Sequence, residues 1–140
     1  MDDAMKLIAG VKMHSGAGYA QTISAGKHQL TADEPESNGG TGTGPAPYAL
    51  LLSALGACTA ITLRMYADRK GWTLGAVEVG LQLLKSKDGR ERIDREIRVG
   101  AALTEEQRTR LAEIAGKTPV TRSITAGVPI ATTVVAATPE

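Results

Sequence analysis

The sequence contains no phenylalanine and only one cysteine, Cys58, among its 140 residues. One cysteine cannot form a disulfide within the chain, which agrees with a reducing compartment. The aromatic residues are Trp72 and three tyrosines, so a core must be built from Leu, Val, Ile and Ala. Apolar residues make up 42% of the chain, which is enough for such a core, and we expect one domain over residues 1–140.

Excess charge and targeting signals are also lacking. Sixteen Lys and Arg residues against fifteen Asp and Glu leave a net charge of +1, which does not favour nucleic acid or anionic lipid as a partner. Residues 1–6 carry two aspartates and lack the basic and apolar regions of a signal peptide. No apolar run approaches about 20 residues without a charge, so a spanning helix is not expected. We therefore expect a cytoplasmic protein that binds neither nucleic acid nor membrane.

Alternating apolar and polar residues predict strands in three regions. The first is an antiparallel meander, the second a hairpin with Asp88-Gly89 at its turn, and the third a single β-branched strand. The expected strands cover residues 6–14, 19–23, 28–32, 77–83, 93–101 and 130–136. A polar, glycine-rich loop over residues 33–40 follows the meander.

Helical signals predict one long helix and two short ones. Pro47 suits a first turn and Gly71 a C-terminus, which gives a helix over residues 47–70, about 36 Å long. Thr104 and Gln107 form a capping box for the second helix, and Thr118-Pro119 begins the third. The order of elements predicts an α+β fold with antiparallel sheet. The long helix should bury one apolar stripe, made of Leu51, Ala54, Leu55, Cys58, Ile61, Thr62 and Met65.

Cys58 allows two opposite interpretations. A cysteine on an apolar stripe is most often a buried core residue. As a nucleophile it must react as the thiolate, which needs a nearby cation or helix N-terminus. Cys58 lies about three turns after Pro47, beyond the reach of the helix dipole, and Arg64 should point away from the sulfur. An activating cation would therefore come from elsewhere in the fold or from a second subunit.

Other motifs give little support for a binding site. Gly42-Thr43-Gly44 lacks the lysine and the spacing of a phosphate-binding loop. His14 and His28 have no second ligand at metal-binding spacing. We therefore expect no metal and no cofactor.

Six segments, in this order, together resemble the OsmC/Ohr family in its OsmC-like branch. Each segment is weak alone, but the ordered set is specific and covers nearly the whole chain. The segments are Asp33-Glu34-Pro35, Gly39-Gly40-Thr41-Gly42-Thr43-Gly44-Pro45-Ala46-Pro47-Tyr48, Leu50-Leu51-Leu52-Ser53-Ala54-Leu55-Gly56-Ala57-Cys58-Thr59, Arg64-Met65-Tyr66-Ala67, Ile93-Asp94-Arg95 and Glu113-Ile114-Ala115-Gly116-Lys117-Thr118-Pro119-Val120.

The resemblance implies a fold and an activity. It implies antiparallel sheets around a long central helix, and a homodimer that forms by intertwining, with two pockets at the subunit boundary. It also implies oxidative-stress defence by thiol-dependent reduction of organic hydroperoxides, with Cys58 at the peroxidatic position.

The sequence departs from the family pattern at four places. Thr118 stands where the family has its resolving cysteine, and Thr121 where a histidine is common. The family arginine is missing from the turn at residues 15–18, and the family glutamate from the helix start at Tyr48. An external thiol would then have to reduce oxidised Cys58.

The expected site consists of Cys58 and several pocket or supporting residues: Tyr48, Thr118, Thr121, His14, His28 and Arg122. We expect one basic residue, His14, Lys27, His28 or Arg122, to replace the missing arginine across the dimer. The alternative is a relative without peroxidase activity that binds a small apolar ligand in the pocket at the dimer interface. The sequence leaves open whether the protein is an enzyme.

Overall fold

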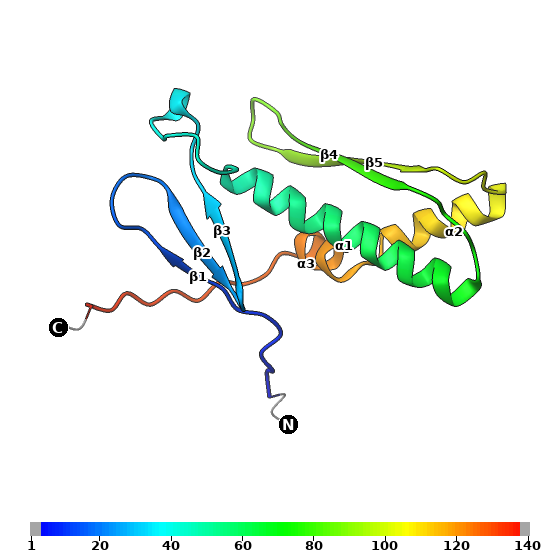
Figure 1. Ribbon diagram of the computed structural model, residues 1–140, viewed down its shortest axis with the longest axis horizontal. Coiled ribbons are helices and arrows are strands. Elements are labelled where there is room, and N and C mark those ends of the chain that lie inside the picture. The colour runs from blue at the N-terminus through cyan, green and yellow to red at the C-terminus, as the bar shows by residue number, and fades with distance from the viewer. Residues whose placement is uncertain (1–3, 138–140) are drawn as a thin grey trace. The chain divides into compact units, whose positions relative to one another are not determined.

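The computed structural model describes residues 4–137. These residues group into two compact parts. The first part comprises the chain up to Ala54 together with Leu81–Asp94, and the second comprises Leu55–Gly80 and the chain from Arg95 onward. Figure 1 labels helix α1 (Pro47–Lys70) and strands β4 (Val77–Lys85) and β5 (Glu91–Val99). Each of these three elements has residues in both parts. That residues 1–140 form a single domain stays a prediction.

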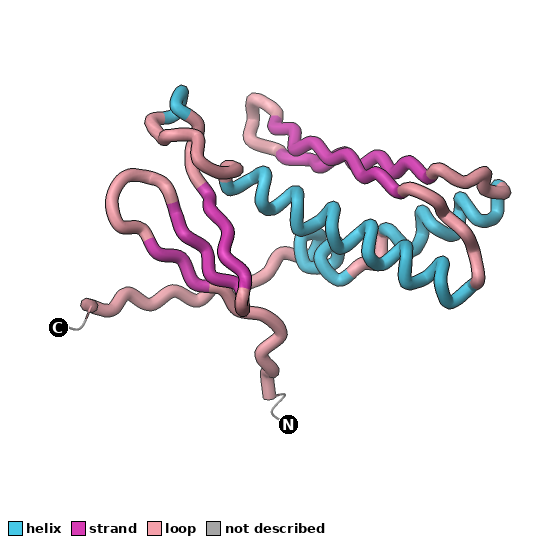
Figure 2. The backbone as a smooth tube through the Cα atoms, in the orientation of Figure 1, coloured by secondary structure: helices cyan, strands magenta, loops and turns pink. Residues whose placement is uncertain are grey.

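The first part contains the predicted antiparallel meander. Strands β1 (Lys12–His14), β2 (Gln21–Ala25) and β3 (His28–Ala32) lie in that order, with Ile23 of β2 opposite Leu30 of β3 (Figure 2). Gly26 has a φ of 60°, which permits the tight turn between β2 and β3. The prediction that the first strand begins at residue 6 is wrong, because residues 6–11 are exposed and have no partner strand in the described chain.

A buried carboxylate organises the loop that leads into α1. Asp33 accepts hydrogen bonds from the backbone N–H and the hydroxyl of both Thr41 and Thr43, at 2.7–3.2 Å. These bonds, those from Thr41 and Thr43 side chains above all, hold the pKa of Asp33 well below its usual range. Two glycines are required by close packing, since a Cβ would lie 2.0 Å from the Glu34 carbonyl oxygen at Gly40 and 2.2 Å from that of Thr31 at Gly44. The glycine run is therefore a packed structure around Asp33.

The second part has its own aliphatic core. Leu63 and Ala67 of α1 pack with Leu74 and Leu111 in that core. Partly buried side chains surround these four residues: Tyr66, Trp72, Val77, Ile97, Val99, Leu103 and Ile114. The rings of Tyr66 and Trp72 meet edge to face, with their centroids 5.5 Å apart. The absence of phenylalanine is thus compensated by branched aliphatic residues.

The buried row of α1 differs from the predicted stripe. The buried residues are Leu55, Thr59, Leu63 and Ala67, at steps of four. Three members of the predicted stripe, Leu51, Ile61 and Met65, are exposed. Within one chain the prediction is confirmed for Leu55 and wrong for these three residues, because the helix is apolar over most of its circumference and periodicity alone did not select the side that packs against the chain's own elements.

The remaining helices begin where the sequence predicts. Helix α2 (Glu105–Ala115) has the capping box of Thr104 and Gln107, and the Thr118 side chain caps helix α3 (Pro119–Ala126). Strands β4 and β5 form the second hairpin. The predicted last strand is wrong: within the described residues, 127–137 form no strand, and Ile130 and Val134 are exposed. A β-branched sequence becomes a strand only when a neighbouring strand supplies hydrogen-bond partners.

Helix α1 is long and apolar enough to cross a membrane by length and composition. The expectation that no such segment exists is therefore wrong, because the charges of this helix gather at its C-terminal end. One helix of this kind is weak evidence for a membrane span, since apolar helices of soluble proteins meet the same criteria.

Candidate active site

Cys58 lies in the middle of α1 and is half-buried. It stands next to Thr59, which belongs to the fully buried row of the helix, while Ile61 on the other side is exposed. The Cys58 residue is therefore neither fully buried nor fully exposed. A half-buried position of this kind is compatible with attack on a small reagent.

A guanidinium group lies beside the turn that carries Cys58. Arg95 of β5 donates from Nη1 to the hydroxyls of Thr59 and Thr121, both at 3.0 Å, and from Nη2 to the carbonyl of Ala115 at 3.0 Å. These partners come from α1, α3 and the end of α2, so that one side chain connects four elements of the second part. The residue next to Cys58 thus carries a direct hydrogen bond from a cation.

The hydroxyl groups around Arg95 form a closed network. Thr59 is fully buried and donates to the carbonyl of Leu55 at 2.7 Å. The hydroxyls of Thr118 and Thr121 lie 2.6 Å apart, and Thr118 is also fully buried. No buried side-chain nitrogen or oxygen lacks a hydrogen-bond partner in the described part of the chain. The side chains are therefore held in fixed positions by mutual hydrogen bonds.

The positive charge of Arg95 is not neutralised by an ion pair. Its partners are two hydroxyls and a carbonyl oxygen, and the ion pairs found among residues 4–137 involve other arginines. An arginine remains charged at any physiological pH. No carboxylate therefore cancels the charge of the guanidinium among the residues that the structure describes.

The structure brings together only some of the predicted supporting residues. Thr118 and Thr121 join the Arg95 network, whereas Arg122 is exposed on α3. The other candidates belong to the first part and are exposed: Tyr48, His14, Lys27 and His28. The hypothesis that His14, Lys27, His28 or Arg122 serves Cys58 across a dimer stays a prediction.

Sequence reasoning missed Arg95 and Thr59 as site residues. A signal for Arg95 was present, because it occupies the partly buried alternate position of β5 between Ile93 and Ile97. A charged residue at such a position usually has a specific partner. Thr59 likewise lies four residues after Leu55 on the buried side of α1. No group of three or more His, Cys, Asp or Glu side chains in the described residues could hold a metal ion.

Comparisons with known proteins identify relatives of this chain. A family model described as OsmC-like protein matches residues 40–133. No characterised protein sequence matches significantly.

Three solved structures illustrate the similarity of fold. A Psychrobacter arcticus protein named for osmotic stress induction and detoxification response is 15% identical, with a TM-score of 0.74 over 85% of this chain and 90% of that one. An OsmC-like protein of Mycoplasma pneumoniae is 21% identical, with a TM-score of 0.69 over 86% and 89%. An organic hydroperoxide resistance protein, OsmC, of Legionella pneumophila is 18% identical, with a TM-score of 0.61 over 86% and 91%. These structures confirm the predicted α+β fold with a long helix and antiparallel sheets.

Proposed function

This chain belongs to the OsmC-like protein family, and we propose that it serves oxidative-stress defence by reducing organic hydroperoxides through Cys58. The observation that supports this most directly is the position of Cys58: half-buried, and next to a threonine whose hydroxyl accepts a hydrogen bond from the unneutralised Arg95. Relatives in fold include an organic hydroperoxide resistance protein, which favours the same role.

The proposed reaction needs one cysteine and an external thiol. The Cys58 thiolate attacks the outer oxygen of a hydroperoxide, so that an S–O bond forms, the O–O bond breaks and the alkoxide leaves as the alcohol after it takes a proton. The sulfur is oxidised by two electrons to a sulfenic acid. A first external thiol then forms a mixed disulfide with loss of water, and a second one releases reduced Cys58 and a small-molecule disulfide. This scheme accommodates Thr118 at the position where the family has a resolving cysteine.

Arg95 is proposed as the substitute for the family arginine that the turn at residues 15–18 lacks. Its guanidinium would stabilise the negative charge that develops on the peroxide oxygens as Cys58 attacks. Replacing Arg95 by Gln should slow oxidation of Cys58 by about tenfold, the effect of losing roughly 1.4 kcal/mol of anion stabilisation. Arg95→Lys, which keeps the charge, should slow the oxidation of Cys58 less than Arg95→Gln does. Arg98→Gln is the matched control, because Arg98 is exposed on the same strand.

The decisive experiment traps the oxidised sulfur. The protein is incubated with tert-butyl hydroperoxide and a sulfenic-acid reagent, with Cys58→Ser as the control, and the adduct is located by peptide mass spectrometry. An adduct on Cys58 within seconds supports the proposed reduction of hydroperoxides by Cys58. No adduct after an hour contradicts it and favours the alternative, a relative that binds a small apolar ligand, which native mass spectrometry of the purified protein would detect.

The protein is also proposed to act as a homodimer in the cytoplasm. Ile61 and Met65 of α1 are 54% and 56% exposed, and an apolar helix face of this kind is usually covered by a partner. A dimer is typical of the family that the sequence resembles. A monomer mass by light scattering at micromolar concentration would contradict this part of the proposal.

A further inference from the structure

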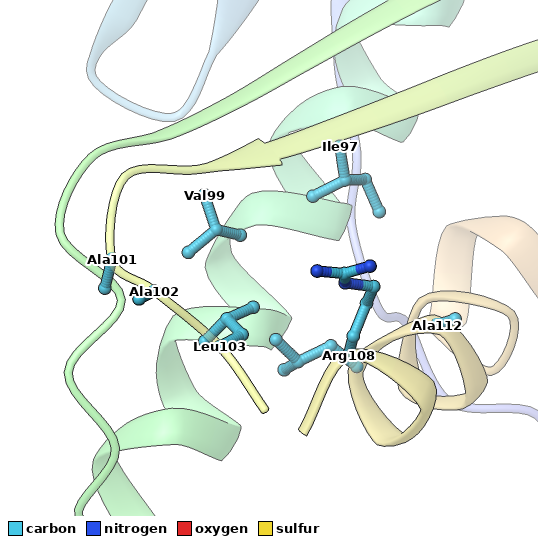
Figure 3. Close-up of a pocket in the computed structure, with 8 residues that line it drawn as sticks. Ile97, Val99, Ala101, Ala102, Leu103, Arg108 and Ala112 are labelled. Atoms are coloured by element: carbon cyan, nitrogen blue, oxygen red, sulfur yellow. The ribbon is translucent and has the colours of Figure 1, made fainter. Parts of the chain in front are cut away.

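A cavity of about 510 Å³ lies in the second part of the chain, between the end of β5 and helix α2 (Figure 3). Its walls are aliphatic, formed by Ile97, Val99, Leu103 and Leu111 together with alanines of α2 and of the preceding loop. Cys58 is not among the lining residues, so the cavity is separate from the candidate active site. Its volume falls within the range of about 300–1,000 Å³ that is typical of small-molecule sites.

One charged side chain lines this cavity. Figure 3 shows Arg108 reaching from α2 toward the β5 side chains, with its guanidinium on the side of Ile97. The ion-pair partner of Arg108 is Glu105, and the two are 3.8 Å apart with side chains that are 68% and 87% exposed. A loose, solvated pair of this kind contributes little, so Glu105 neutralises the guanidinium weakly. The cavity therefore combines apolar walls with one available cation.

From this combination we propose that the cavity binds a small amphipathic carboxylate, such as a medium-chain fatty acid. The alkyl chain would lie against Ile97, Val99, Leu103 and Leu111, where it leaves water. The carboxylate would accept hydrogen bonds from Arg108, whose planar fork matches a carboxylate in geometry. A single guanidinium favours a monoanion over a phosphate, for which sites commonly provide several donors. This site is independent of the proposed function at Cys58.

The test compares a carboxylate with the alcohol of the same chain length. Binding of hexanoate, octanoate, decanoate and 1-decanol is measured by titration calorimetry, below the concentrations at which they form micelles. Affinity should rise about fourfold for each added methylene, as expected for burial of apolar surface. Decanoate should bind more tightly than 1-decanol.

Matched variants locate the site and its charge. Arg108→Gln should weaken decanoate binding about tenfold and change 1-decanol binding less than twofold, whereas Arg98→Gln, at an exposed arginine outside the cavity, should change neither. Ala112→Phe and Ala102→Phe, two independent substitutions that fill the cavity, should each abolish binding of both ligands. Cys58→Ser should bind normally, which separates this test from that of the peroxidase.

Three results would overturn the proposal. The first is the absence of saturable binding for every ligand of the series. The second is an equal loss of decanoate affinity in Arg108→Gln and Arg98→Gln, which would mean a general charge effect. The third is unchanged binding in both cavity-filling variants when circular dichroism shows that they are folded.

Discussion

Replacement of Arg95 by Met should destabilise the protein by about 2–4 kcal/mol. The substitution removes three hydrogen bonds from a charged donor, to Thr59, Thr121 and Ala115, each worth about 1.5–3 kcal/mol. The loss is partly offset because the guanidinium no longer has to be desolvated. Its former partners also keep others: Thr59 still donates to Leu55, and Thr121 still contacts Thr118 and Ala115.

The free energy of unfolding is best measured by urea denaturation at fixed protein concentration, since a dimer would make it concentration-dependent. Arg95→Lys should lower the free energy of unfolding less than Arg95→Met, because an ammonium group keeps the charge. Some stability should still be lost, because an ammonium group cannot make the same fork of hydrogen bonds. Arg98→Met is the matched control on the same strand: its ion pair with Glu96 is exposed, and the change should stay within about 0.5 kcal/mol.

A double-mutant cycle then tests the contact itself. Thr59→Val removes the hydroxyl that accepts from Arg95, and its coupling with Arg95→Met should be about 1 kcal/mol. An Arg95→Met variant as stable as the Arg98→Met control would mean that the hydrogen bonds of Arg95 do not stabilise the fold. Additive effects of the two substitutions would contradict the contact between Arg95 and Thr59, since additivity is expected only of residues that do not interact.

Two further predictions concern the loop before α1. Because the folded-state pKa of Asp33 is lowered by hydrogen bonds from Thr41 and Thr43, the folded state binds fewer protons than the unfolded state below the ordinary aspartate pKa of about 3.9. The stability that Asp33 contributes is therefore present above about pH 4 and is lost as the pH falls below it. Asp33→Asn should lower the free energy of unfolding at pH 7 and reduce its dependence on pH in the acid range. A variant with the same acid dependence as the unsubstituted protein would contradict this. Gly44→Ala should cost at least about 2 kcal/mol, because its Cβ would lie 2.2 Å from the Thr31 carbonyl oxygen. Gly42→Ala is the control, since the residue has a φ of 65° but open space around it and should cost only about 1 kcal/mol; equal losses in thermal or urea denaturation would refute the packing argument.

Local signals in the sequence were sufficient to predict most of the helices and strands. The bounds of α1 follow from Pro47, which suits the first turn, and from Gly71, whose φ of 71° ends the helix. The capping box of Thr104 and the cap of Thr118 likewise depend on residues three positions apart. Interactions of such short range can be recognised without knowledge of the tertiary structure.

The predictions that failed depend on distant partners. The segment over residues 130–136 has strand-forming composition, yet no other described segment pairs with it. Leu51, Ile61 and Met65 of the predicted stripe are exposed, whereas the helix packs through Leu55, which the stripe contained, and through Thr59 and Leu63, which it did not. An apolar side chain is able to be buried, but it is buried only where a neighbouring helix or strand packs against it.

The candidate site shows the same division. Sequence alone is enough to identify the single thiol, the threonine at the position of the resolving cysteine, the helix that carries Cys58 and the family resemblance. Only the folded chain shows that Arg95, which lies 37 positions after Cys58 in the sequence, donates a hydrogen bond to Thr59, the neighbour of Cys58. A helix or a turn is specified by contacts within a few residues, whereas the surroundings of a sulfur are specified by side chains that meet only after the chain has folded.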